Sequence, residues 1–329
     1  MPSQKSHPKT RQKLGQHFLS QTSWRTRIAE TLPVERDAIW LEIGAGHGEM
    51  TELLATRARR VIAIETDAAL AATLRERAAR WPKGSHGPNV EVVHADVLFL
   101  DLAALVLSQS ANQPLQAMSS QPANEIGTLG GGSFSCDIMR PLPSGVLTPE
   151  AGPDSAAPVS SASRFRVYGN LPYYITSPIL SHLFRFADLI DSIHIVTQLE
   201  VAQRIAAHPR SRDYGYLSTL CQFYARPELV FRIPPGAFQP PPKVTSALIE
   251  MRFPGERAAL GSSDEPAFLK FLQVCFAHKR KTLRNNLRGI YSQRRIECAF
   301  AASALTDNSR AEELTLPQFA QIFVSLAEK

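Results

Sequence analysis

The sequence predicts an α/β fold: a doubly wound, mostly parallel sheet followed by a small helical domain. Three observations lead to it. Short apolar segments alternate with segments of helical periodicity between residues 38 and 225. Two further apolar segments, 228–233 and 245–253, are joined without a helix, as an antiparallel edge pair would be. Beyond residue 255 the periodicity is helical throughout.

The first half of the chain is predicted to contain three strands separated by helices. A helix over 20–31 is indicated by Trp24 and Ile28 at helical spacing. Thr66 or Asp67 is the expected cap of a helix that ends near Arg80. The remaining expected elements are strands at 38–43, 60–65 and 90–94 and a helix at 49–59.

The second half resumes with a β-branched and aromatic strand, 165–168, which Gly169 ends. A helix is expected after Pro178, and a proline-rich loop, 234–243, separates the last two strands. The other expected elements are a strand at 192–197 and helices at 200–207, 216–225, 266–277, 279–291, 294–302 and 317–327.

Composition divides the chain into three predicted regions: a basic arm (1–20), the sheet domain (21–255) and the helical domain (256–329). Residues 108–163 are rich in Ser, Pro, Gly, Gln and Ala and carry few charges. We therefore expect a mostly disordered insertion there, with a small cryptic domain as the alternative.

The composition also excludes several classes of protein. The 329 residues are 44% hydrophobic but contain no apolar run long enough to span a membrane, and the amino terminus lacks a secretory core. The four cysteines lie far apart, which argues against a zinc site or a disulfide framework and favours free thiols in a reducing cytosol. We expect a cytoplasmic protein that binds no metal.

The net charge of +6 is concentrated in two segments without any acidic residue, 1–29 and 278–295. The rest of the chain carries a net negative charge. On a surface that only faces solvent, acidic residues usually lie among the basic ones. This segregation of charge therefore indicates a polyanionic partner, and we favour nucleic acid.

A glycine turn, Gly44-x-Gly46-x-Gly48, connects a predicted strand to a helix, where a ligand can approach the backbone closely. Glu65 ends the next strand and can accept both hydroxyls of a ribose. Asp96 ends the third strand and can accept from an adenine amine, although a helix N-cap is its alternative role. A dehydrogenase would share the first two features, but its turn has the spacing GxGxxG. The series favours an S-adenosylmethionine (SAM) site.

Glu42 precedes this turn and could meet the amino group of the methionine moiety, although a buried structural acid is a fair alternative. His47 lies within the turn, where a single histidine is a weak catalytic candidate.

The segment Val167-Tyr-Gly-Asn-Leu-Pro-Tyr-Tyr174 supplies the other half of the predicted site. Pro172 keeps Leu171 extended, so that its carbonyl can point away from the sheet. The Asn170 amide oxygen and the Leu171 carbonyl can accept the two hydrogens of an adenine amine, and Tyr173 can stack on the base. A plain strand-to-helix turn is the alternative. Methyl transfer to such a nitrogen requires positioning and fixed dipoles, and no dedicated general base.

Together these residues resemble the ribosomal RNA adenine N6,N6-dimethyltransferases, above all the bacterial small-subunit enzymes of the kasugamycin-resistance family. The resemblance covers about residues 11–107 and 164–325. The motifs that carry it are Leu14-Gly-Gln-His-Phe-Leu19, Leu41-Glu-Ile-Gly-Ala-Gly46, Val61-Ile-Ala-Ile-Glu65, Ala95-Asp96, Gly169-Asn-Leu-Pro-Tyr173, Phe238-Gln-Pro-Pro-Pro-Lys-Val-Thr-Ser246 and Lys279-Arg-Lys-Thr-Leu-Arg-Asn285.

The resemblance implies a Rossmann-like methyltransferase that places two methyl groups on each of two adjacent adenines near the 3′ end of small-subunit rRNA, during late assembly. It implies target-adenine contacts at Asn170, Leu171 and Tyr173, with Phe238 near the flipped base. The implied SAM contacts are His17, Leu19, Gly44, Glu65, Asp96 and Asn170. The family usually has Asn where this chain has His17 and a short connection in place of residues 108–163.

RNA contacts are expected in the second basic segment, where basic residues recur at helical spacing on one predicted helix. These residues are Lys279, Arg280, Lys281, Arg284 and Arg288. Phe238 is expected either to stack on a base or to plug the space beneath its loop. We expect a monomer.

Three alternatives stay open at this point. One is methylation of large-subunit rRNA of the antibiotic-resistance type, which the helical tail and the proline-rich loop fit less well. The others are a binding protein that acts in assembly or transcription without catalysis, and, weakest, a dehydrogenase.

Overall fold

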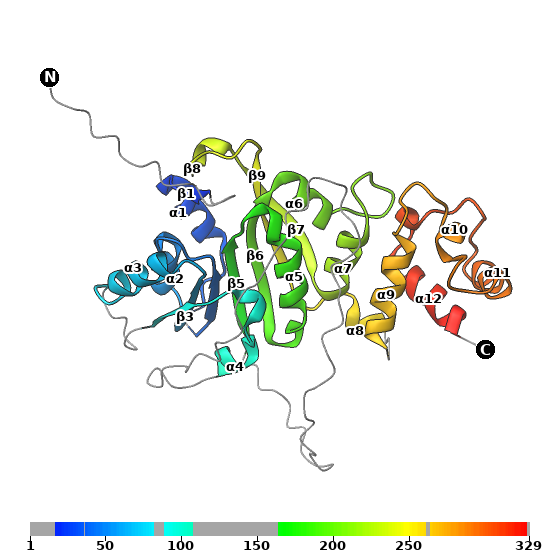
Figure 1. Ribbon diagram of the computed structural model, residues 1–329, viewed down its shortest axis with the longest axis horizontal. Helices are drawn as coiled ribbons and strands as arrows, with labels where there is room; N and C mark the ends of the chain where they lie inside the picture. Colours follow the sequence, from blue (N-terminus) through cyan, green and yellow to red (C-terminus); the bar gives the residue numbers. More distant parts are fainter. Residues whose placement is uncertain (1–16, 36, 82–88, 108–163, 261–263, 328–329) are drawn as a thin grey trace, which may run out of the picture.

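The computed structural model describes residues 17–35, 37–81, 89–107, 164–260 and 264–327. The predicted insertion at 108–163 and most of the predicted basic arm lie outside the described residues. The described chain forms a seven-stranded sheet with strand order β4-β3-β2-β5-β6-β9-β7 (Figure 1). The strands are β2 (Ile39–Ile43), β3 (Arg60–Glu65), β4 (Val90–His94), β5 (Phe165–Asn170), β6 (Ile190–Gln198), β7 (Arg226–Ile233) and β9 (Ser246–Arg252).

The sheet confirms the predicted fold class. Neighbouring strands from β4 to β6 are all parallel, whereas β9 is antiparallel to both β6 and β7. Strands β3 and β4 have the bounds that the sequence predicted. A separate two-stranded ladder joins β1 (Phe18–Leu19) to β8 (Phe238–Gln239) in antiparallel orientation.

Both faces of the central strands β2, β3, β5, β6 and β9 are buried, which explains why these strands are nearly continuous apolar segments. The edge strands β4 and β7 are only partly buried. Side chains alternate between the faces, so Leu41 and Val167 belong to one hydrophobic cluster. Trp40 and Tyr168, each one residue away, belong to a second cluster under α1 and α2. Ile193 and Val196 divide β6 in the same way.

The helices cover the sheet and then form a group of their own. Asp67, rather than Thr66, caps α3, because its carboxylate accepts the N–H groups of Ala69 and Leu70 at 2.9 and 3.3 Å. The helices around the sheet are α1 (Thr22–Thr31), α2 (Glu49–Ala55), α3 (Ala68–Ala78), α4 (Leu102–Leu107), α5 (Thr176–Phe184), α6 (Leu199–Ile205) and α7 (Tyr216–Tyr224).

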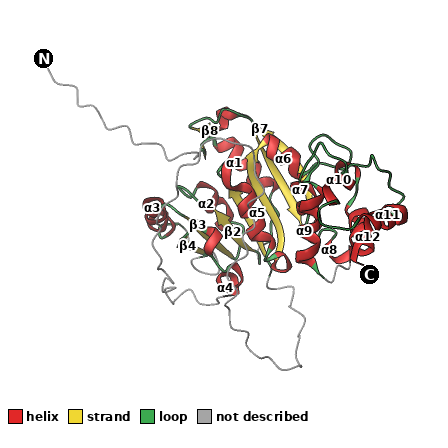
Figure 2. Cartoon of the chain, turned by 45° about the vertical axis from the view of Figure 1, so that its right-hand side comes forward, coloured by secondary structure: helices red, strands yellow, loops and turns green. Residues whose placement is uncertain are grey.

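The carboxyl-terminal helices are α8 (Arg257–Leu260), α9 (Glu265–Cys275), α10 (Leu283–Leu287), α11 (Gln293–Ala302) and α12 (Leu316–Ala327). The predicted helix over 279–291 is wrong. Only α10 is helical there, because the Thr282 hydroxyl caps its amino terminus and the residues before it form turns. In both views α9–α12 gather beyond α7, at the end of the molecule opposite α3 (Figures 1 and 2).

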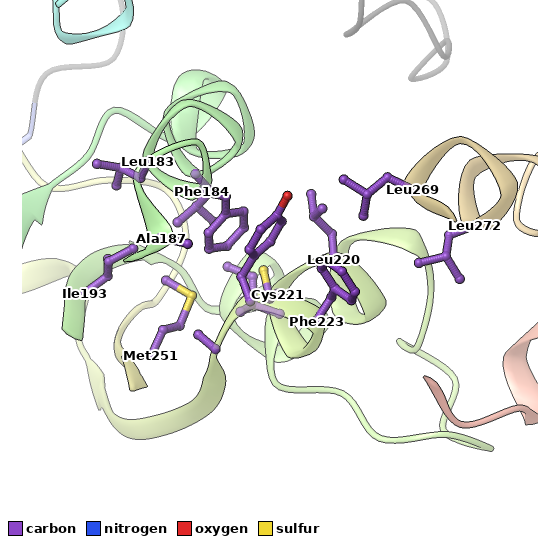
Figure 3. Close-up of a cluster of buried hydrophobic side chains, with 14 of the residues drawn as sticks. Leu183, Phe184, Ala187, Ile193, Leu220, Cys221, Phe223, Met251, Leu269 and Leu272 are labelled. Carbon is purple, nitrogen blue, oxygen red and sulfur yellow. The ribbon is translucent and has the colours of Figure 1, made fainter. Parts of the chain in front are cut away.

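One hydrophobic cluster runs from the sheet into these helices. Figure 3 shows Leu220, Cys221 and Phe223 of α7 between the sheet side and α9, which contributes Leu269 and Leu272. All five side chains are buried. The division at residue 255 stays a prediction, since apolar packing continues across it. Within the described ranges, no helix is both long and apolar enough to cross a membrane.

Candidate active site

A cleft of about 260 Å³ opens at the carboxyl ends of β2, β3 and β5. Most of the residues predicted to contact SAM or the target adenine line it: His17, Gly44, Glu65, Asp96, Asn170, Leu171 and Tyr173. A second groove, of about 750 Å³, lies where β7 begins and β9 ends, and none of these residues lines it. The predicted site and the first cleft therefore coincide.

The position of the cleft follows from the strand order. Strand β2 lies between β3 and β5. The chain continues from β2 to β3 on one side and from β5 to β6 on the other, so the loops that follow these two neighbouring strands lead in opposite directions. Ile43 is paired with Gly169, which places Gly44 and Asn170 next to each other at the edge of the sheet. The glycine turn and the Asn-Leu-Pro-Tyr segment thus form facing walls.

The glycine turn needs glycine for two separate reasons. Gly44, Gly46 and Gly48 have φ values of 73°, 56° and 86°, which L-residues with a side chain rarely adopt. A Cβ on Gly46 would also lie 3.1 Å from the Phe18 ring. The Gly44 and Ala45 N–H groups both donate to the Ile64 carbonyl, which ties the turn to the end of β3.

Glu65 is held rigidly in the floor of the cleft. One carboxylate oxygen accepts the Gly46 N–H at 2.8 Å and the other accepts the Asp67 N–H at 2.9 Å. The side chain is 4% exposed. Each oxygen retains lone pairs, so the fixed carboxylate can still accept hydroxyl hydrogens from a ligand.

Asp96 has the N-cap role that the sequence offered as an alternative, and it also lies at the cleft. Its Oδ1 accepts the Leu98 N–H at 3.0 Å and so caps a short 3₁₀ helix, Val97–Phe99. The same residue lines the cleft. The cap orients the carboxylate and leaves its second oxygen able to accept a hydrogen from an amine.

Asn170 presents its oxygen to the cleft because its nitrogen is engaged elsewhere. The Asn170 Nδ2 donates to the His17 carbonyl at 2.8 Å. Across the described ranges, no donor lies within hydrogen-bonding distance of Asn170 Oδ1. Leu171 is fixed by its N–H, which donates to the Val196 carbonyl at 3.1 Å. A Cβ on Gly169 would lie 2.7 Å from Leu171 Cδ2, so this strand end requires glycine.

Tyr173 lies half-buried at the mouth of the cleft. Its hydroxyl is 2.7 Å from Ser246 Oγ, and burial raises the pKa of Tyr173 above its ordinary value. Its ring lies 5.7 Å from the His17 ring at an angle of 27°. No role was predicted for Ser246, although this residue ends the motif that begins at Phe238.

Leu19 and Phe238 lie beneath the cleft and do not line it. They face each other in the β1–β8 ladder and are 7% and 2% exposed. The burial of Phe238 fits its alternative role as a plug beneath its loop, and stacking on a base stays a prediction. Phe18 does line the cleft, and its pattern in the sequence gave no sign of this.

Glu42 is the buried structural acid rather than a cleft residue. It is 2% exposed and points to the face of the sheet that carries Trp40. Burial raises the pKa of Glu42 to about 8. Its Oε2 has no hydrogen-bond partner among the described residues, so the neutral carboxyl form is favoured near pH 7.

The basic residues that were predicted to bind RNA differ in their exposure and in their partners. Lys279, Arg280, Lys281 and Arg288 are exposed on turns that flank α10. Arg284 instead pairs with Asp307 at 2.9 Å and with Glu297 at 3.8 Å. Its guanidinium also lies 5.5 Å from the Phe300 ring.

The cleft fits SAM by its own chemistry. It combines a glycine turn that is open at Gly44, the carboxylates of Glu65 and Asp96 at two adjacent strand ends, and apolar walls from Ile43, Ile64 and Val97. Glu65 suits the ribose hydroxyls, Asp96 suits the adenine amine, and the apolar walls suit the adenine ring. No group of three or more His, Cys, Asp or Glu that could hold a metal occurs in the part of the chain that the structure describes.

Comparison with known proteins points in the same direction. Residues 7–328 match the model of the ribosomal RNA adenine dimethylase family. A protein named ribosomal RNA small subunit methyltransferase A from Koribacter versatilis is 39% identical over 98% of this chain and 96% of its own length. A protein of the same name from Acidobacterium capsulatum is 37% identical over 98% and 93%.

Two solved structures share the fold. The 23S rRNA methyltransferase ErmE has a TM-score of 0.58 and 25% identity, covering 94% of this chain and all of that one. A dimethyladenosine transferase from Plasmodium falciparum has a TM-score of 0.61 and 19% identity, covering 93% of this chain and 96% of that one.

Proposed function

The chain belongs to the ribosomal RNA adenine dimethylase family, and on that premise we propose that it dimethylates N6 of two adjacent adenines near the 3′ end of small-subunit rRNA. The methyl donor is SAM. The observation that supports the proposal is the hydrogen bond of Asn170, which engages the amide nitrogen and leaves the oxygen of this cleft residue to accept from a ligand.

SAM, when bound, supplies a methyl group made electrophilic by its sulfonium. We assign the ribose hydroxyls to Glu65 and the adenine amine of the cofactor to Asp96. Gly44 lets the ligand approach the backbone. The family's motif assigns further cofactor contacts to His17 and Leu19; we ascribe them to the main chain, because the Leu19 side chain does not line the cleft. These assignments rest on the fixed carboxylates and on the family's motifs.

The target adenine presents its amine to two acceptors. Asn170 Oδ1 and the Leu171 carbonyl each accept one hydrogen, which turns the nitrogen lone pair toward the methyl donor. Tyr173 stacks on the base, and its hydroxyl is already satisfied by Ser246, so the ring is held in place. The methylated nitrogen then loses its proton to solvent, which requires no base from the protein.

We assign RNA binding to the exposed lysine and arginine residues of the segment 278–295. Four exposed residues, Lys279, Arg280, Lys281 and Arg288, can contact phosphates, and the affinity should depend strongly on salt. The protein would act as a monomer on an assembling small subunit in the bacterial cytoplasm.

The test is methyl transfer in vitro from labelled SAM. Small ribosomal subunits from cells that lack this activity should accept two methyl groups on each of two adjacent adenines. Fully methylated small subunits are the control and should accept none. A protein that binds SAM but labels neither adenine would refute the proposal.

A second candidate is methylation of 23S rRNA, which the similarity to ErmE at 25% identity favours. The same assay with large subunits and with free 23S rRNA distinguishes the two. Label in 23S rRNA, and none in the small subunit, would select this candidate.

A further inference from the structure

We propose that His17 is a positioning residue for methyl transfer: it fixes the Asn170 amide so that the oxygen, and not the nitrogen, faces the target amine. This inference rests on the proposed function. It concerns a short segment, His17, Phe18 and Leu19, which we call the strap. The strap crosses the mouth of the cleft between the glycine turn and β5.

Within the described ranges, the Asn170 amide has one side-chain hydrogen bond, and its partner belongs to the strap. An amide has nearly the same shape in its two flipped orientations, so a hydrogen-bond partner must choose between them. The His17 carbonyl, 2.8 Å from Nδ2, is that partner. In the flipped orientation two oxygens would face each other, and the cleft would receive an NH₂ group. Because the target amine is itself a donor, a flipped Asn170 cannot accept its hydrogen.

The carbonyl of His17 is in turn fixed by the imidazole of the same residue. Nδ1 lies 2.8 Å from the Pro240 carbonyl, which can only accept, so Nδ1 carries the hydrogen and donates. The ring also lies against the ring of Tyr173, at 5.7 Å between centroids. One side chain thus contacts the proline-rich loop on one side and the aromatic residue of the site on the other.

The strap is anchored by β8, 217 to 223 residues further along the chain. Ser20 and Gln21 N–H groups donate to the Ala237 carbonyl at 3.0 and 3.2 Å, and Leu19 is paired with the buried Phe238. The two motifs that seemed separate in the sequence therefore form one unit. Phe238 and the proline loop serve the reaction by holding the strap.

Phe18 provides an internal comparison, because it faces the other wall. Its ring lies 4.9 Å from the His47 ring and would be 3.1 Å from a Cβ on Gly46. The side chain thus contacts the glycine turn, on the cofactor side of the cleft. Neighbouring residues of one strap should therefore have separable effects on catalysis and on cofactor binding.

The first experiment compares His17→Ala with Phe18→Leu in steady-state methyl transfer. His17→Ala should lower kcat at saturating SAM about tenfold, with less than a threefold change in the KM for SAM. Phe18→Leu should act mainly on that KM. His17→Asn retains a side-chain donor for the Pro240 carbonyl and should restore most of the lost kcat. Wild-type kcat in His17→Ala, or a change in KM alone, would overturn the proposal.

The second experiment needs no methyl transfer. Asn170→Asp places a carboxylate oxygen against the His17 carbonyl, so the strap should detach more often. Hydrogen exchange of the Ser20 and Gln21 amides, which donate to the Ala237 carbonyl just before β8, should then accelerate about tenfold. Unchanged exchange would show that the amide and the strap are not coupled. Since wild-type exchange is measured without rRNA, a failure of the proposed function cannot imitate this result.

Discussion

Both the cleft and the basic segment 278–295 were predicted from the sequence. The structure brings the predicted cleft residues together, but it does not form the helix that was predicted in the basic segment. At the cleft, seven predicted residues from five separate stretches of the chain converge on one cavity. In the basic segment, one predicted helix is reduced to five residues, and Arg284 points toward acids of its own domain. A hydrogen-bonded sheet dictates where strand ends meet, whereas a run of charge dictates no geometry.

The difference has a physical basis. Residues at the ends of adjacent parallel strands are brought together by the strand register, as with Ile43 opposite Gly169. In a helical region a single cap decides which way side chains point. Thr282 starts α10 late, so Lys279 to Lys281 precede the helix.

Replacing the acceptor at the centre of the cleft should have the largest effect. Asn170→Ala removes the oxygen that holds the target amine, and loss of one preorganised hydrogen-bonding group lowers turnover about 10²- to 10³-fold. Methyl transfer at saturating SAM measures this, with thermal unfolding to confirm that the fold persists. Turnover within a few-fold of wild type would remove Asn170 from the mechanism.

The buried carboxyl group of Glu42 should make the free energy of unfolding depend on pH. The folded pKa of Glu42, about 8, exceeds its unfolded value of 4.5. The folded state therefore retains a proton that the unfolded state releases. The resulting stability is complete below pH 4.5 and is lost as pH rises through about 8.

Glu42→Gln is neutral at every pH, so the variant should gain about 4 kcal/mol on wild type between pH 5 and pH 8.5. Denaturant unfolding at the two pH values measures this gain. A difference that does not change with pH would mean that Glu42 is ionised in the folded protein.

The glycines of the turn should differ in a graded way. Gly48→Ala combines a positive φ with a Cβ 2.3 Å from Cδ1 of the fully buried Leu74, and should cost about 2 kcal/mol of folding stability. Gly44→Ala has a positive φ but only one distant neighbour, at 3.8 Å, and should cost about 1 kcal/mol. Equal unfolding midpoints for the two variants would contradict this ranking.

The basic segment should separate into structural and RNA-binding residues. Arg284→Ala loses partly buried ion pairs and should cost about 1 kcal/mol of stability. Arg288→Ala should leave stability unchanged and reduce the slope of log affinity against log salt by about 0.7 to 0.9, as expected for one phosphate contact. Filter binding at several salt concentrations and thermal unfolding give both quantities. The reverse assignment would mean that the charged segment rearranges on RNA.

Elements whose bounds are set by hydrophobic periodicity and by neighbouring cap residues could be predicted from the sequence. The bounds of β3 and β4, and a cap at either Thr66 or Asp67, follow from local residues, and the structure selects Asp67. What could not be predicted depends on contacts between distant residues. The hydrogen bond of Tyr173 with Ser246 and that of His17 with Pro240 join residues 73 and 223 positions apart. The burial of Phe238 depends on its pairing with Leu19 across the β1–β8 ladder.

The most direct test is a position-resolved map of N6,N6-dimethyladenosine in small-subunit rRNA from cells that lack this gene. Two adjacent dimethylated adenines near the 3′ end should disappear, return when the wild-type gene is supplied, and stay absent with Asn170→Ala. If both marks persist without the gene, or if the Asn170→Ala protein restores them, the oxygen-lined cleft is not where that rRNA is methylated.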